Sequence, residues 1–149
     1  MRALLSESLT IERVTVAIAD LPTHLQGTTL VQLSDFHFDG QSLSQALLTA
    51  VIAHCNALNP DLVVLTGDFI TDDVEDIHRL TPFLHQLQSR FGRYAVLGNH
   101  DARYPQWQRT ICRALVAAQI HPLWNEIAYP VGDKLPLVGV ADLQSRECD

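Results

Sequence analysis

Three short polar segments of this chain carry the side chains best suited to metal chemistry. They are Ser34-Asp35-Phe36-His37, Gly67-Asp68 and Gly98-Asn99-His100-Asp101. Carboxylate, amide oxygen and imidazole groups are the usual protein ligands of divalent ions such as Mn²⁺, iron and Zn²⁺. Each segment directly follows an apolar run, and ligands gather at the carboxyl edge of an open α/β sheet. The sequence therefore predicts a metal site at such an edge.

The first two segments supply most of the predicted ligands. Asp35 and His37 are two residues apart, so in an extended backbone their side chains point to the same side and can bind one ion. Gly67 permits a sharp turn after a strand. This turn would place Asp68 where its two carboxylate oxygens can bridge two ions about 3.5–4 Å apart. We expect Asp35, His37 and Asp68 to belong to one metal centre.

The third segment adds one predicted ligand and two predicted catalytic residues. Asn99 offers a neutral carbonyl oxygen to a metal ion. His100 points in a different direction and can donate a proton or a hydrogen bond to a phosphoryl or leaving-group oxygen. Asp101 can orient His100 through the other ring nitrogen.

A simpler interpretation gives these residues structural roles alone. Asp35 and Asp68 would cap the following helices, while Asn99 and Asp101 would occupy turn positions. A flavodoxin-like domain with such caps would bind no metal. Each motif by itself fits this interpretation about as well as the functional one. The occurrence of all three motifs in order, each after an apolar run, favours the metal site.

The elements that must position these residues follow from hydrophobic patterning. Apolar runs predict buried parallel strands at residues 29–33, 62–66 and 94–97. Helical spacing of apolar residues predicts helices over residues 42–58, 74–87 and about 107–119. Pro82 lies inside the second of these patterns and predicts a kink, or a break before a helix that begins near Thr81. The alternation of strands and helices predicts an α/β fold.

The two ends of the chain show strand patterns of a different kind. Residues 11–18 predict an opening strand, and residues 123–131 and 135–140 predict a hairpin around Gly132-Asp133-Lys134. The apolar faces of this hairpin need a cover. An exposed edge strand predicts self-association, poor solubility or a partner chain.

Length and composition narrow the class of protein. A chain of 149 residues, 47% of them hydrophobic, fits a single domain over residues 1–149. The net charge of −7 and the scattered basic residues argue against sequence-specific nucleic-acid binding. Three unclustered cysteines predict no disulfide framework, so a cytoplasmic location is expected. No long apolar stretch opens the sequence, so no signal peptide or transmembrane segment is expected.

The order and wording of the motifs resemble the calcineurin-like metallophosphoesterase superfamily. The matching stretches are Ser-Asp-Phe-His, Leu-Thr-Gly-Asp-Phe and Val-Leu-Gly-Asn-His-Asp. The preceding Leu-Pro-x-x-Leu-x-Gly stretch is similar to the bacterial phosphodiesterase branch. The resemblance extends over about residues 11–142, and Gly-Asn-His-Asp is its most specific part.

This resemblance implies a fold, a reaction and a role for each site residue. The fold would be a four-layer α/β/β/α sandwich with a mixed sheet. The activity would be hydrolysis of phosphodiesters or phosphomonoesters by a metal-bound hydroxide at a dinuclear centre. Asp35 and His37 would bind the first ion, Asp68 would bridge, and Asn99 would bind the second. His100 would assist the leaving group.

One departure from the family pattern affects these expectations. Family members complete the centre with later histidines, and this sequence contains no histidine after His121. We therefore expect a domain that is incomplete at its C-terminal side. The second ion would be held by Asp68 and Asn99 alone, hence weakly, with reduced activity. The alternative is a non-catalytic metal- or nucleotide-binding domain, or a half-site supplied to a partner subunit.

Overall fold

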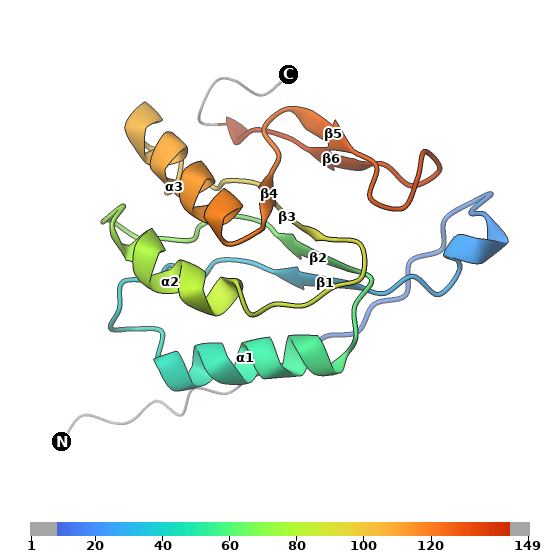
Figure 1. Ribbon diagram of the computed structural model, residues 1–149, viewed down its shortest axis with the longest axis horizontal. Coiled ribbons are helices and arrows are strands. Elements are labelled where there is room, and N and C mark those ends of the chain that lie inside the picture. The colour runs from blue at the N-terminus through green and yellow to red at the C-terminus, as the bar shows by residue number, and fades with distance from the viewer. Residues whose placement is uncertain (1–8, 144–149) are drawn as a thin grey trace.

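Three apolar runs of the sequence form neighbouring parallel strands in the computed structural model, which describes residues 9–143 (Figure 1). The sheet contains, in spatial order, β1 (Leu30–Leu33), β2 (Leu62–Leu65), β3 (Arg93–Ala95) and a short fourth strand, β4 (His121–Pro122). All three neighbouring pairs are parallel. The carboxyl ends of β1, β2 and β3 therefore meet at one edge of the sheet, as the sequence predicts.

The predicted helices are present with somewhat shorter bounds: α1 (Gln45–Ala57), α2 (Asp76–Leu84) and α3 (Pro105–Ala117). α1 begins after Ser44, whose hydroxyl accepts a hydrogen bond from the amide of Leu47 at 3.1 Å. α2 begins at Asp76 and contains Pro82, so a break before Thr81 is wrong. Pro82 is exposed, and its missing amide removes one hydrogen bond without ending this short helix.

One face of the parallel sheet packs against the helices. α2 contacts both α1 and α3, so the three helices form one layer (Figure 1). The core between sheet and helices includes the fully buried side chains of Val63, Leu65, Phe69, Ile70, Ile77, Leu80, Leu84, Ile111 and Leu115. Close packing of these side chains fixes the strand ends from which the polar segments emerge.

The other face of the sheet carries the predicted hairpin. Its strands are shorter than predicted: β5 (Glu126–Ala128) and β6 (Leu137–Gly139) pair antiparallel and form a separate small sheet. Side chains alternate across a strand, and Leu30, Val64 and Tyr94 line an apolar groove with Val138 of the hairpin. Five large apolar side chains of this region are exposed: Leu30, Ile127, Tyr129, Val138 and Val140. The described residues thus leave this apolar region partly uncovered.

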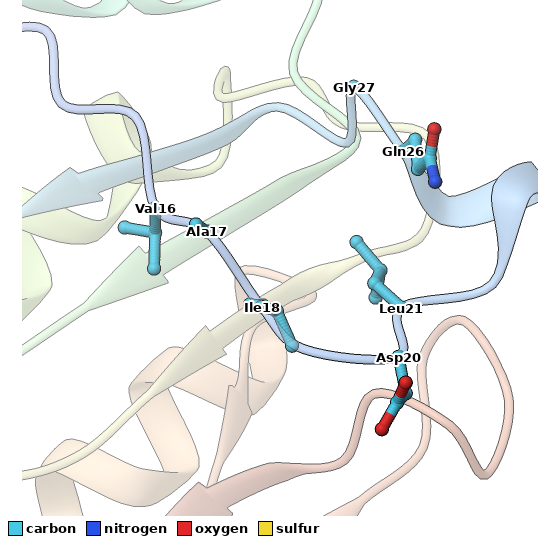
Figure 2. A pocket seen from close by; sticks show the side chains of 7 residues that line it. All are labelled: Val16, Ala17, Ile18, Asp20, Leu21, Gln26 and Gly27. Carbon is cyan, nitrogen blue, oxygen red and sulfur yellow. The ribbon is translucent and has the colours of Figure 1, made fainter.

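The strand predicted at residues 11–18 is wrong. Val14 and Val16 are 80% and 72% exposed, and no described strand pairs with this segment. An apolar–polar alternation becomes a strand when a neighbouring strand bonds its backbone, and no strand among residues 9–143 does so here. A short 3₁₀ helix, Thr23–Leu25, follows. Figure 2 shows the pocket lined by Val16, Ala17, Ile18, Asp20, Leu21, Gln26 and Gly27, none of which is a predicted metal ligand.

Candidate metal centre

The loops that follow β1 and β2 run side by side. The amide of Asp35 donates to the carbonyl of Gly67 at 3.1 Å, and the amide of His37 donates to the carbonyl of Asp68 at 2.9 Å. These bonds continue the parallel pairing of the two strands beyond their carboxyl ends. They bring Asp35 and His37 from one loop next to Asp68 from the other.

Three of the predicted metal ligands have a strained backbone. The φ angles of Asp35, His37 and Asp68 are 53°, 39° and 51°. These values lie in the left-handed region, which is unfavourable for residues other than glycine. Each such residue costs about 1–3 kcal/mol and persists where its surroundings hold it. Phe36 and Phe38 on either side of His37 are buried and anchor this loop. Strain of this kind concentrates at functional sites.

Two glycines allow the loops after β2 and β3 to approach closely. A Cβ atom at Gly67, whose φ is +93°, would stand 2.3 Å from the backbone nitrogen of Gly98. A Cβ atom at Gly98 would stand 2.1 Å from Oδ1 of Asp68. Any larger residue at either position would push the loops apart. Close packing of the two loops therefore requires glycine at positions 67 and 98.

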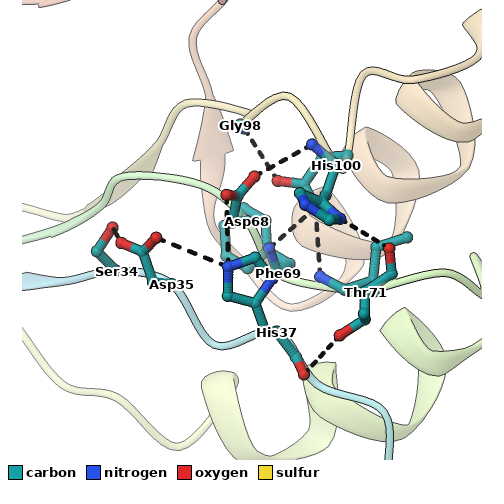
Figure 3. Close-up of polar contacts among 10 residues, drawn as sticks. Ser34, Asp35, His37, Asp68, Phe69, Thr71, Gly98 and His100 are labelled. Atoms are coloured by element: carbon teal, nitrogen blue, oxygen red, sulfur yellow. Dashed lines mark hydrogen bonds and ion pairs between the residues drawn. The ribbon is translucent and has the colours of Figure 1, made fainter.

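The side chains of His37, Asp68 and His100 converge (Figure 3). Their candidate ligand atoms all lie within 4.8 Å of one another. His37 Nε2 is 3.6 Å from Asp68 Oδ2 and 3.8 Å from Asp35 Oδ1. The rings of His37 and His100 meet edge to face, with centroids 4.9 Å apart. The structure thus brings together residues from all three polar segments.

Asp35 lies at the rim of this cluster. Its side chain is 67% exposed, compared with 40% for His37 and 16% for Asp68. The hydroxyl of Ser34 donates to Oδ2 of Asp35. Asp35 can therefore join a cation held by His37 and Asp68 from the solvent side.

The backbone of the third segment fixes the Asp68 carboxylate. The amide of His100 donates to Asp68 Oδ1 at 3.2 Å, while Asp68 Oδ2 faces His37. One carboxylate oxygen is thereby held by the fold, and the other is directed into the cluster. Sequence reasoning missed a further residue, Thr71, whose carbonyl oxygen lies 2.9 Å from His100 Nδ1. No sequence signal could identify this contact, because it uses a backbone atom.

Asp101 does not orient His100, so this expected contact is wrong. Asp101 is fully buried, and its carboxylate accepts hydrogen bonds from the amides of Phe69, Ile70 and Gly98 at 2.9, 3.3 and 3.0 Å. Burial raises the pKa of Asp101 to about 6, against the lowering effect of the three amides. Because it faces these amides, Asp101 ties the loop after β3 to the loop after β2.

The helix-capping interpretation of the carboxylates finds no support. The cap of α1 is Ser44, and α2 begins after Glu75 without a side-chain cap bond. Asp35 and Asp68 thus do not cap these helices. Asn99 and Asp101 do lie in a turn after β3, as the structural interpretation also predicts, and Asn99 is partly exposed.

The donor set of the cluster fits a divalent cation. Two imidazoles and one carboxylate are ligands for Mn²⁺, iron, Zn²⁺ and related ions. A single cation can be reached by all three residues, which makes His37, Asp68 and His100 a candidate site for one ion.

None of the helices described between residues 9 and 143 has the length and apolar character needed to cross a lipid bilayer.

Several curated proteins are similar to this chain. It is 31% identical over 138 residues to a transmembrane protein with metallophosphoesterase domain from Danio rerio, with 89% of this chain and 31% of that protein aligned. It is 43% identical over 79 residues to UDP-2,3-diacylglucosamine pyrophosphatase LpxG of Chlamydia muridarum, covering 52% and 24% of the two chains. A probable cyclic nucleotide phosphodiesterase of Moraxella catarrhalis is 40% identical over 79 residues, covering 50% and 28%.

The chain spans about a third or less of the length of these relatives, at 31%, 24% and 28%. No solved structure gives a significant match. The family model for calcineurin-like phosphoesterases matches residues 28–144, which include all three polar segments. This chain therefore belongs to the calcineurin-like phosphoesterase family.

Proposed function

We propose that this chain carries the metal-binding half of a phosphoesterase that hydrolyses phosphodiesters or phosphomonoesters. The observation that carries the proposal is the convergence of His37, Asp68 and His100 at the carboxyl edge of the parallel sheet. Family membership supports a hydrolytic role for a cluster at this place.

The proposed centre assigns a role to each residue of the cluster. His37 and Asp68 would hold a first divalent ion together with Asp35, and Asp68 and Asn99 would contribute to a second, weaker one. The ions would supply positive charge to the phosphoryl oxygens and acidify a water molecule. Asp68 would meet the first ion through Oδ2, which faces His37, while the His100 amide holds the carboxylate in place through Oδ1.

His100 lies within reach of the same ion, but in the proposed reaction it contacts the leaving group and the metal is held by the other residues. Its Nδ1 is engaged with the carbonyl of Thr71, so Nε2 is the nitrogen free to meet an ion or a substrate oxygen. A protonated His100 would donate a hydrogen bond to the leaving group through this atom. Asp101 would act at a distance, by holding the loop that carries His100.

We also propose how the rest of the fold is completed. The exposed apolar side chains around β5 and β6 fit a further layer, as in a four-layer α/β/β/α sandwich with a mixed sheet. Residues outside this chain would supply that layer and the remaining ligands of the second ion. In their absence, the hairpin would mediate self-association. We also propose a cytoplasmic location, because the three cysteines are unclustered.

Hydrolysis of bis(p-nitrophenyl) phosphate and p-nitrophenyl phosphate with added Mn²⁺ tests this function. Turnover that requires Mn²⁺ and disappears in Asp68→Asn is the expected result. Asp133→Asn, an exposed carboxylate in the hairpin turn, is the charge-matched control and should keep full activity. Metal binding without turnover would instead favour a binding module or a half-site. Turnover that persists in Asp68→Asn would refute the proposed centre.

A further inference from the structure

Thr71 joins the two histidines of the candidate centre (Figure 3). Its hydroxyl donates to the carbonyl of His37 at 2.8 Å, and its own carbonyl oxygen lies 2.9 Å from His100 Nδ1. The two partners are 34 and 29 residues away in the chain, in the loops after β1 and β3. Both contacts are partly buried, which makes them stronger than the same bonds in open solvent.

The contact to His100 selects one form of its ring. A backbone carbonyl can accept a hydrogen bond and cannot donate one. His100 Nδ1 must therefore carry the proton that points at Thr71, and the neutral ring keeps a lone pair on Nε2. Fixing the second nitrogen of a histidine in this way sets the orientation and basicity of the nitrogen that meets a ligand.

The contact to His37 holds a strained backbone. His37 has a φ of 39°, and its amide is already bonded to the carbonyl of Asp68 at 2.9 Å. The Thr71 hydroxyl fixes the other side of the same residue, at its carbonyl. The imidazole of His37 is thus aimed by two bonds to the loop after β2.

The side chains next to Thr71 cannot replace its hydroxyl. Ile70 is fully buried and apolar. Asp72 is exposed, and its carboxylate accepts from Arg103 Nη1 at 3.0 Å.

We propose that Thr71 is a positioning residue of the metal centre. Its hydroxyl bonds to the carbonyl of His37, and this bond holds residue 71 in place. The Thr71 carbonyl then accepts from Nδ1 of His100, which leaves Nε2 of His100 available to a ligand. This inference rests on the proposed metal site and adds a residue that the three sequence motifs do not contain.

Two variants of Thr71 and one control variant separate the effect of its hydroxyl from the effect of its shape. Thr71→Val keeps the branched shape and removes the hydroxyl, and Thr71→Ser keeps the hydroxyl. Thr28→Val is the matched control, because the Thr28 hydroxyl also donates to a partly buried carbonyl, that of Leu25, away from the cluster. Mn²⁺ affinity is measured for each variant by titration. Long-range ¹H–¹⁵N spectra of the metal-free chains, with His100→Gln for assignment, report the protonated nitrogen of His100.

We expect the wild-type spectrum to place the proton of neutral His100 on Nδ1. Thr71→Val should give a mixture of the two ring forms and weaken Mn²⁺ binding about five- to tenfold, the usual effect of one lost hydrogen bond. Thr71→Ser should restore both properties, and Thr28→Val should change neither. A wild-type proton on Nε2, or equal Mn²⁺ affinity in Thr71→Val, would overturn the proposal.

The two readouts distinguish this inference from the proposed function. If the wild-type chain binds no Mn²⁺, the proposed function fails, and the metal-free spectra still decide the role of Thr71. In that case an unchanged His100 signal in Thr71→Val overturns the inference. If Thr71→Val does not fold, Thr71→Ala removes the same hydroxyl and takes its place, and a wild-type proton on Nε2 still overturns the inference.

Discussion

Gly98 lies directly against the carboxylate of Asp68, closely enough that a Cβ atom at position 98 would stand 2.1 Å from Oδ1. The same Cβ atom would stand 2.7 Å from the backbone nitrogen of Asp68. The loop after β3 therefore touches the central ligand of the candidate site without any side chain between them. The position of Asp68 depends on the absence of a side chain at Gly98, because the amide of His100 reaches Oδ1 from the same loop.

Gly98→Ala should weaken metal binding at least about tenfold, since the added methyl group must displace the Asp68 carboxylate. Gly139→Ala is a matched control. Its Cβ atom would stand equally close, 2.1 Å, to Leu123 Cβ, outside the cluster. Both variants should lose stability in urea, and only Gly98→Ala should lose Mn²⁺ affinity. Equal affinities in the two variants would show that Asp68 does not depend on Gly98.

Asp101→Asn should lower the free energy of unfolding by about 1–3 kcal/mol, because an amide group cannot accept from all three backbone amides. The control is Asp72→Asn, which breaks the exposed ion pair with Arg103 and should cost less than about 1 kcal/mol. Urea unfolding at neutral pH measures both. A smaller loss in Asp101→Asn than in Asp72→Asn would contradict this role of Asp101.

The exposed pair Ile127 and Val138, which are opposite each other in β5 and β6, should drive self-association of this chain. Val138→Lys should shift the elution volume in size-exclusion chromatography towards the monomer, because a charge in an apolar contact must lose its hydration. Val116→Lys, on an exposed position of α3, serves as the control and should leave the elution volume unchanged. A wild-type chain that elutes as a monomer would contradict this prediction.

The sequence predicts the elements that carry the site because the apolar runs of β1, β2 and β3 are short, continuous and separated by helical patterns. Residues 11–18 have a strand pattern too, yet a strand also needs a partner, which a local pattern cannot supply.

The details of the site follow less well from the sequence. Spacing suggests that Asp101 meets the ring of its neighbour His100, but the chain turns so that Asp101 is buried against backbone amides. The true partner of His100 Nδ1 is a backbone carbonyl, that of Thr71, which has no residue-type signature. Residue types thus identify His37, Asp68 and His100 as candidates, but only the folded chain shows that these three side chains meet.

Titration of the metal-free chain with Mn²⁺, followed by the electron paramagnetic resonance signal of the free ion, tests the central claim most directly. The account predicts saturable binding that Asp68→Asn abolishes, that His37→Ala weakens at least about tenfold, and that Asp133→Asn leaves unchanged. Wild-type and Asp68→Asn chains that bind Mn²⁺ equally, or a wild-type chain that binds none, would contradict a cation site centred on His37 and Asp68.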